Sequence, residues 1–271
     1  MLKRLFTIPL IISALLTASI FILMQTHPLP TMPIAYEASL HGNWEIYVMD
    51  AARGLSYNIT QHRAWDSTPT WSPDGQQVVF LSDRDGPIGL YVMDAMGGPA
   101  RRLIDGSTTN FSAVRWTDDS QYITYISRNN NSFTRNQIDV RTGDITVLIT
   151  DADRSQILLT QAEGGQPNFP LSSRQGDLTA FMRYRDGAWG LYLSRHGLSD
   201  AQLLIRGHTY SNSPPSLSPD AKRILFISAP DGQRNVYMLD LSCLDAGNCQ
   251  QAARRLTDSP IWKGRPIWLP A

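Results

Sequence analysis

The side chains that most often carry out chemistry in proteins are scattered along this 271-residue sequence. Its five histidines stand far apart, at positions 27, 41, 62, 196 and 208. There is no Gly-x-Ser-x-Gly elbow, no His-Glu-x-x-His motif and no phosphate-binding loop. His41 falls at a turn position, where a solvated side chain is the simplest interpretation. The sequence therefore predicts neither a catalytic constellation nor a cofactor.

Carboxylates recur in the segments "SPDG" (72–75) and "DRDG" (83–86), and calcium is the metal that such residues suggest. A calcium loop alternates its oxygen ligands and closes with a bidentate glutamate. Here the aspartate stands directly before a glycine, which is typical of a hairpin turn. We therefore expect no metal site.

The two cysteines, Cys243 and Cys249, are the remaining reactive side chains. They lie in a stretch that is longer than the corresponding loop in the rest of the chain. A cysteine pair within one inserted loop predicts a disulfide in a compartment outside the cytosol. Two free thiols are the alternative, and a zinc site would need more ligands than this loop offers.

A sequence pattern repeats about every 45 residues, and the fold that it predicts determines where these side chains lie. One position of the pattern holds a large apolar residue, and a second holds a residue that tolerates a positive φ. A third holds tyrosine, and a fourth lies in a closing apolar segment. The large apolar residues are Trp71, Trp116, Leu171, Leu217 and Trp268, and the residues that tolerate a positive φ are Gly42, Gly86, Asn131, Gly187 and Gly232. The tyrosines are Tyr47, Tyr91, Tyr192 and Tyr237, and the residues of the closing segment are Ile59, Leu103, Leu148, Leu204 and Leu256.

Each unit is predicted to form four short strands joined by tight turns, because β-branched and aromatic runs alternate with Asp-Gly and Gly-Gly pairs. A four-stranded unit of this length is one blade of a β-propeller. The alternative all-β fold is a sandwich, which does not need the same residue at the same place in every unit. We expect five blades, at 34–60 with 266–271, and at 69–104, 114–150, 167–206 and 215–257.

The first blade is split between the two ends of this pattern. Ile34 begins in the second strand of a unit, whereas Pro266, Trp268 and Pro270 match Pro69, Trp71 and Pro73 of a first strand. The C-terminal strand is therefore predicted to complete the N-terminal blade, which closes the ring and removes an open sheet edge. A sixth blade, the alternative count, would have to be formed by 151–165, which is short for four strands.

The succession "WSPDG...SDRDG...LYVMD...RRL" resembles the WD40-like PD40 repeat of the TolB family. The resemblance extends from Ile34 to Ala271. It implies a β-propeller in the periplasm or outside the cell that binds proteins or peptides without catalysis. Related blades also occur as accessory domains of peptidases.

The N-terminal segment is predicted to be a transmembrane signal-anchor, at 1–24. Lys3 and Arg4 precede twenty uncharged residues, which as a helix would span about 30 Å. The basic residues should stay in the cytoplasm, with a proline-rich spacer at 25–33 leading to the propeller in the periplasm or extracellular space. If the segment is instead a cleaved signal, the protein is secreted. The zero net charge gives no indication of a nucleic-acid partner.

Binding is expected at one mouth of the central channel, where the chain passes from one blade into the next. Aromatic and polar residues gather in those segments, as in protein-binding surfaces; packing between blades is the alternative for each aromatic. The predicted binding residues are Trp65, Asp66, Asn110, Phe111, Tyr210, Asn212, Trp262, Lys263 and Arg265. The expected function is non-catalytic binding of a protein or peptide. A sensory small-ligand module, or a hydrolase or lyase with its site at the channel mouth, is the alternative.

Overall fold

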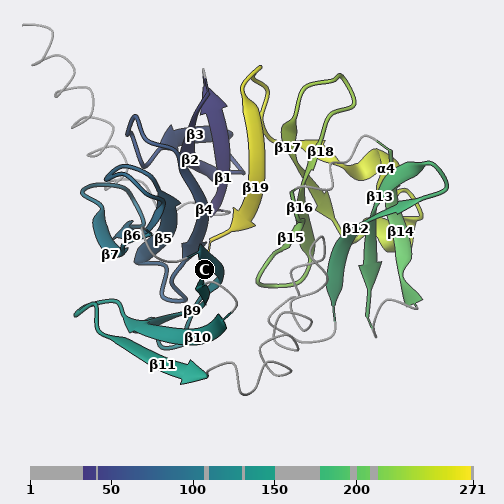
Figure 1. Ribbon diagram of the computed structural model, residues 1–271. Helices are drawn as coiled ribbons and strands as arrows, with labels where there is room; N and C mark the ends of the chain where they lie inside the picture. The colour runs from purple at the N-terminus through teal and green to yellow at the C-terminus, as the bar shows by residue number, and fades with distance from the viewer. Residues whose placement is uncertain are drawn as a thin grey trace, which may run out of the picture.

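The computed structural model describes residues 33–40, 42–106, 110–129, 132–149, 178–195, 200–207 and 213–269. They form five antiparallel sheets, which we label A to E (Figure 1). Sheet A contains β19 (Trp262–Trp268), β1 (Pro33–Leu40), β2 (Asn43–Asp50) and β3 (Leu55–Asn58). Sheet B contains β4 (Asp66–Trp71), β5 (Gln77–Ser82), β6 (Gly89–Asp94) and β7 (Arg101–Ile104), and sheet C contains β8 (Asn110–Trp116), β9 (Tyr122–Asn129), β10 (Ser132–Asp139) and β11 (Ile145–Ile149).

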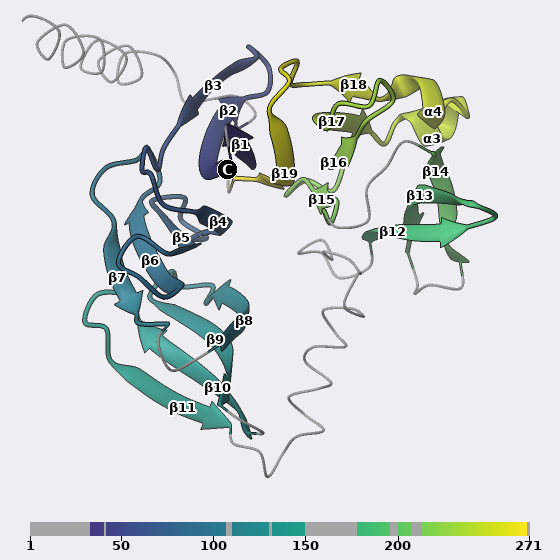
Figure 2. The ribbon, with the colours of Figure 1, turned by 45° about the horizontal axis from the view of Figure 1, so that its top comes forward.

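Sheet D contains β12 (Thr179–Arg185), β13 (Ala188–Ser194) and β14 (Gln202–Arg206). Sheet E contains β15 (Ser216–Leu217), β16 (Arg223–Ser228), β17 (Asn235–Asp240) and β18 (Arg254–Arg255). Figure 2 shows the sheets following one another along an arc in the order C, B, A, E, D. This succession of antiparallel, mostly four-stranded sheets is the architecture of a β-propeller. The number of five blades stays a prediction.

The turns contain the residue types that the repeat predicts. The hairpin between the second and third strands of four sheets places a glycine at positive φ, as in Gly86 (113°) and Gly187 (77°). The preceding turn is held by a hydroxyl that donates to an aspartate two residues later. The pairs are Ser72 with Asp74, Thr117 with Asp119, and Ser218 with Asp220, each at 2.5 Å between oxygens.

Apolar clusters fill the spaces between neighbouring sheets. One cluster joins sheets A and B around Phe80, a second joins B and C around Ile123, a third joins D and E around Phe226, and a fourth joins E and A around Tyr36. Aromatic pairs across the second and third strands recur in four sheets, as in the stacked Phe80 and Tyr91, whose centroids are 6.0 Å apart.

Two tryptophans that end inner strands also link neighbouring sheets through hydrogen bonds. The indole Nε1 of Trp116 donates to the carbonyl oxygen of Thr70 at 2.8 Å. The indole of Trp268 does the same to the carbonyl of Ser216, at 3.1 Å. At this repeated position, Trp116 and Trp268 therefore bind the backbone of the inner strand of the preceding sheet, whereas the buried indole nitrogen of Trp71 has no such partner.

Sheet A is assembled from the two ends of the described chain, in the strand order β19-β1-β2-β3. The register pairs Ile34 with Trp268 and Ala35 with Ile267, and the amide of Leu269 donates to the carbonyl of Pro33 at 3.0 Å. The strand β19 lies directly beside β1 (Figure 1). The predicted completion of the N-terminal sheet by the C-terminal strand is therefore present.

The predicted disulfide between Cys243 and Cys249 is also present. Both cysteines are buried in the cluster between sheets D and E, and each begins a single-turn helix, α3 (Cys243–Ala246) and α4 (Cys249–Ala252). The insertion thus supplies the only helices of the described part of the chain. Among the described residues, no helix has the length and apolar character needed to cross a bilayer. The predicted anchor at 1–24 lies outside the described residues.

Candidate functional site

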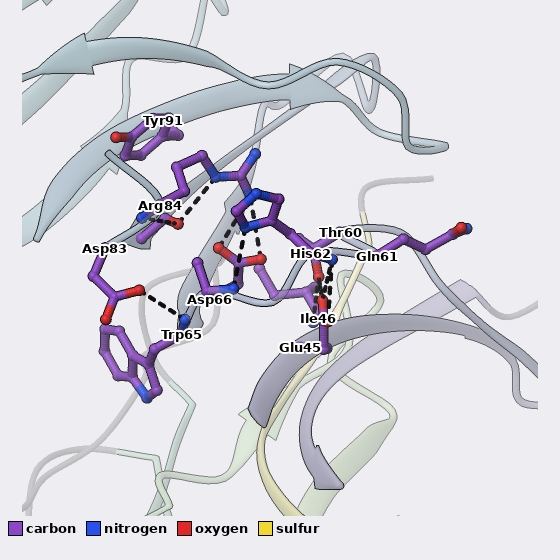
Figure 3. A network of polar contacts seen from close by, with 12 residues as sticks. Glu45, Ile46, Thr60, Gln61, His62, Trp65, Asp66, Asp83, Arg84 and Tyr91 are labelled. Carbon is purple, nitrogen blue, oxygen red and sulfur yellow. Dashed lines mark hydrogen bonds and ion pairs between the residues drawn. The ribbon is translucent and has the colours of Figure 1, made fainter. Parts of the chain in front are cut away.

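The candidate site lies where the inner strands β4 and β19 begin, together with the segment that leads into β4. Figure 3 shows the part of the site around Asp66. We call Trp65, Asp66, Trp262, Lys263 and Arg265 the inner rim. These are the predicted binding residues whose side chains the structure describes. Of the others, Asn110 and Phe111 lie in β8, where only the backbone is described, and Tyr210 and Asn212 lie outside the described residues.

The inner strands share a bulge close to the rim. Thr68, Ala113 and Arg265 have φ values of 57°, 52° and 42°, and each stands three residues before the tryptophan that ends its strand. The strand register shifts at the same places. A positive φ outside glycine and asparagine costs on the order of 1–3 kcal/mol, so surrounding contacts must stabilise each bulge.

Glu37 provides those contacts between sheets A and B. Its buried carboxylate accepts hydrogen bonds from the amide of Thr68 at 2.6 Å and from the hydroxyl of Ser67 at 2.9 Å. The guanidinium of Arg265 lies 3.5 Å away. Burial raises the pKa of Glu37, and the positive charge of Arg265 opposes that change. The amide of Arg265 itself donates to the hydroxyl of Ser213 at 2.8 Å, so a serine holds the bulge of β19.

Asp66, the first residue of β4, is fully buried and binds Arg84 from the neighbouring hairpin (Figure 3). The Arg84 nitrogen Nη2 lies 3.0 Å and 3.1 Å from the two carboxylate oxygens. The same guanidinium stacks over the rings of Phe80 and Tyr91, at 5.0 Å and 5.1 Å from their centroids. Burial raises the pKa of Asp66, and the hydrogen bonds from Ser82 and Arg84 oppose it.

A second buried carboxylate, Glu45, holds the segment that enters β4. It accepts hydrogen bonds from the hydroxyl of Thr60 and from the amide of His62, the latter at 3.1 Å (Figure 3). The imidazole Nδ1 of His62 accepts from the amide of Ala64 at 3.1 Å. The amide of Trp65 donates to the carboxylate of Asp83 at 2.8 Å. The backbone before the rim is therefore fixed by side chains of sheets A and B.

Lys263 is buried, with 1% of its surface exposed, although lysine is usually a surface residue. Its ammonium donates to the carbonyl oxygens of Ser259 and Ile261, both at 2.7 Å, and thereby ties the preceding turn to β19. Burial, and secondly the charge of Arg255, lowers the pKa of Lys263 to about 8.

We expect Lys263→Met to change how stability depends on pH. Because the folded protein holds its Lys263 proton less tightly than the unfolded chain, the free energy of unfolding should rise between about pH 8 and pH 10.5. The variant lacks this contribution, which is on the order of 1–3 kcal/mol. Urea unfolding of both proteins across this pH range measures the difference. A difference that stays constant with pH would contradict the assignment.

The two aromatic residues of the rim lie in different environments. Trp262 has 59% of its surface exposed, and the guanidinium of Arg234 lies 4.6 Å from its ring centroid. Trp65 is half-buried. Trp262 and the half-exposed Arg265 therefore offer the accessible contact surface, whereas Asp66 and Lys263 hold the backbone in place.

Sequence reasoning did not identify Glu37, Glu45, Ser67, Thr68 or Arg84 as site residues. Glu37 carried a usable signal, since the corresponding positions of sheets B and E hold Leu81 and Ile227. A lone carboxylate at a repeated apolar position indicates a buried acid with specific partners. The other four are common polar residues whose roles depend on contacts with distant segments.

The acidic and imidazole groups near the rim are engaged in contacts within the protein. The buried carboxylates of Glu37, Glu45 and Asp66 accept hydrogen bonds from groups of the protein itself. His62, the one histidine within the described ranges, uses Nδ1 for a backbone amide, so that nitrogen is occupied. No group of three or more metal-ligating side chains occurs among the described residues.

Comparison with known proteins agrees with the fold. Residues 31–157 match the PD40 family model, which is described as a TolB beta propeller domain. The uncharacterized peptidase YuxL of Bacillus subtilis is 35% identical over 79 residues, and dipeptidyl-peptidase 5 of Porphyromonas gingivalis is 27% identical over 113 residues. The crystal structure of TolB from Acinetobacter baumannii superposes with a TM-score of 0.44 at 15% identity, covering 95% of this chain and 71% of that one.

The matched regions are small parts of the curated relatives. They cover 29% of this chain but 12% of YuxL, and 40% of this chain but 16% of dipeptidyl-peptidase 5. The similarity to these two peptidases therefore concerns repeats within a much longer protein.

Proposed function

Because the repeats of this chain are those of a TolB-like β-propeller, we propose that it is a non-catalytic module that binds a protein or peptide through the inner rim. One observation carries this proposal. Exposed Trp262 and half-exposed Arg265 both lie in β19, three residues apart, on a backbone that Glu37, Ser213 and Lys263 hold in a fixed conformation. Aromatic and arginine side chains on a rigid strand are the usual anchors of protein recognition.

The rigidity of the rim favours affinity. A side chain that is already positioned loses little conformational freedom when a partner binds, so more of the contact energy appears as affinity. The bulge at Arg265 is strained, yet its amide and its guanidinium both have partners, in Ser213 and Glu37. The rim is therefore prepared for a ligand before the ligand arrives.

Two alternatives remain candidates. A hydrolase is favoured by the peptidases YuxL and dipeptidyl-peptidase 5 among the similar proteins, and it would use the channel mouth as its site. Against it stands the internal bonding of the acids near the rim. A sensory module for a small ligand would present the same rim to a smaller molecule. Incubation of the purified propeller with peptide and glycan libraries separates an enzyme from a binder, and a thermal-shift screen detects a small ligand.

We expect Trp262→Ala and Arg265→Asn to weaken partner binding about tenfold or more each, as anchors of an interface do. Asparagine tolerates the positive φ of position 265, so that variant removes the charge while keeping the bulge. The measurement is recovery of cross-linked partners from the native host, quantified against the unmodified protein. Leu55→Ala is the matched control, because Leu55 is 68% exposed on the outer strand β3.

Unchanged recovery with both rim variants would remove the rim from the proposal. Equal losses in the rim variants and in Leu55→Ala would show that binding does not depend on this surface. Turnover of a peptide or glycan by the purified protein would instead support the enzyme alternative.

We further propose that the propeller is held on the outer side of a membrane by residues 1–24. The charge bias of Lys3 and Arg4 before the apolar run supports this orientation. A reporter fused after Pro33 should be active only outside the cytoplasm. Its activity in the cytoplasm would contradict the orientation, and release of the reporter into the soluble fraction would indicate a cleaved signal.

A further inference from the structure

Sheet D offers a second surface, separate from the inner rim. In sheets A, B, C and E, the aromatic residue at the centre of one face belongs to the apolar cluster shared with the preceding sheet, as Tyr91 does in sheet B. Tyr192 holds the place of Tyr91 in sheet D. Tyr192 is itself buried and lines a pocket of about 160 Å³, and among the described residues it belongs to none of the four apolar clusters.

The pocket has an apolar centre. Tyr192 and Leu203 pair across β13 and β14, and Trp189 and Gly190 complete this part of the lining. Leu203 has 41% of its surface exposed, on β14 at the edge of sheet D. The corresponding residue in sheet B is an arginine, Arg102. A partly exposed apolar pocket of this size can accommodate one apolar side chain and is smaller than the usual pocket for a drug-sized ligand.

Positive charge surrounds this apolar centre. Arg185 and Arg206 line the pocket, and the guanidinium of Arg183 lies 5.8 Å from the ring centroid of Tyr192. Asp186 is the one acidic residue of the lining, and its carboxylate lies 3.7 Å from Arg185. Among the described residues, two arginines and one aspartate line the pocket, and a third arginine lies near its tyrosine, in a chain whose total formal charge is zero. The local excess of positive charge complements an acidic partner.

The arginines are placed for an extended ligand. Arg206 donates from Nη2 to the carbonyl of Asp186 at 3.0 Å, which holds its planar group at the pocket margin. Arg185 has 66% of its side chain exposed, so its ion pair with Asp186 lies at the surface, where a ligand can reach it. Arginine binds carboxylates through two parallel hydrogen bonds, so both positions suit acidic side chains that flank an apolar one.

We propose that this pocket docks an extended acidic segment of a partner protein. One apolar side chain of the segment enters the pocket against Tyr192 and Leu203, and neighbouring carboxylates bind Arg185 and Arg206. The surface lies on sheet D and does not depend on the inner rim, so either proposal can stand without the other.

The experiment uses two labelled pentapeptides as probes. The first carries acidic residues on both sides of a leucine, as in acetyl-Glu-Asp-Leu-Asp-Glu-amide, and the second replaces each acid by its amide. Fluorescence anisotropy measures their binding to the whole protein. We expect the acidic peptide to bind at least about tenfold more tightly than the neutral one, and the preference to fall at high salt.

Substitutions then place the binding on sheet D. Arg185→Glu and Leu203→Glu should each weaken the acidic peptide about tenfold or more. Arg102→Glu is the matched control, because Arg102 is an exposed arginine on the outer strand of sheet B. A peptide with lysine in place of each acid should regain binding to the Arg185→Glu protein. Arg185→Gln serves if charge reversal prevents folding, and it should weaken binding in the same direction.

Three results would overturn the proposal. The first is no measurable binding of the acidic peptide to the unmodified protein, and the second is equal binding of the acidic and neutral peptides. The third is an equal loss in Arg102→Glu and Arg185→Glu, which would indicate general attraction to positive charge. If the peptide binds and only the Trp262 and Arg265 variants weaken it, the inner rim is its site and the pocket on sheet D is not.

Discussion

Deletion of Pro266 to Ala271 is expected to unfold the propeller, at a cost of at least about 5 kcal/mol, which is comparable to the whole stability of a typical domain. Chain ends normally tolerate trimming, because few contacts hold them. Here the deleted stretch includes the second half of β19, the inner strand of sheet A.

The large effect follows from the two clusters that this stretch joins. Ile267 and Leu269 pack in the cluster between sheets A and B, and Trp268 packs in the cluster between E and A. Trp268 is half-buried, and its indole nitrogen donates to the carbonyl of Ser216. Each large apolar side chain removed from a core costs about 2–5 kcal/mol, and the deletion also exposes the backbone of β1.

The thermal midpoint and the urea midpoint of the propeller, with and without the last six residues, measure this effect. Trp268→Ala alone should cost about 2–4 kcal/mol, at the lower side of the range for buried aromatics, because the ring is half-buried. A chain that lacks only residues 270 and 271 is the matched control, since it keeps all of β19. Identical midpoints for the six-residue deletion and the full chain would contradict closure through β19.

The substitution Asp66→Ala is expected to destabilise the protein by about 3–5 kcal/mol, because it leaves the charge of Arg84 uncompensated. The side chains of Asp66 and Arg84 are 0% and 12% exposed, so water cannot replace the lost carboxylate. The variant should also loosen the start of β4 and with it the position of Trp65.

A double-mutant cycle tests this explanation. Arg84→Met in the Asp66→Ala background should restore much of the stability, because an apolar pair of similar volume often replaces a buried ion pair without loss. Arg53→Met is the matched control, since Arg53 is exposed and pairs with Asp50 at 3.6 Å. Equal costs for Asp66→Ala with and without Arg84 would show that the ion pair does not explain the effect.

Much of the fold could be predicted because the repeat acts locally. Gly42, Gly86, Gly187 and Gly232 all have the positive φ that the hairpins need, and glycine is the residue that accepts it most readily. The joining of β19 to β1 could be predicted because Trp268 stands where Trp71 and Trp116 stand in their own units. Residues at the same position of each repeat have equivalent neighbours, so the strands of one well-marked unit predict the strands of the others.

The site was less predictable, because its contacts join segments that are distant in the sequence. Glu37 meets Thr68 from the next sheet and Arg265 from the far end of the chain, and no local pattern brings these three together. The positive φ values of Thr68, Ala113 and Arg265 have no propensity signal, since these residues rarely adopt that conformation. Lys263 has the composition of a surface residue, and only the fold of the turn at Ser259 buries it.

The strand order of sheet A has a consequence for biosynthesis. The strand β1 leaves the ribosome early, and its partner β19 follows more than 200 residues later. At synthesis rates of about 5–20 residues per second, the backbone of β1 waits roughly 10–45 s for its partner. During that time its apolar residues and unpaired amides are open to wrong partners, including a nascent copy of the same chain. Because β2 pairs with only one edge of β1, we expect the other edge to need protection until β19 arrives.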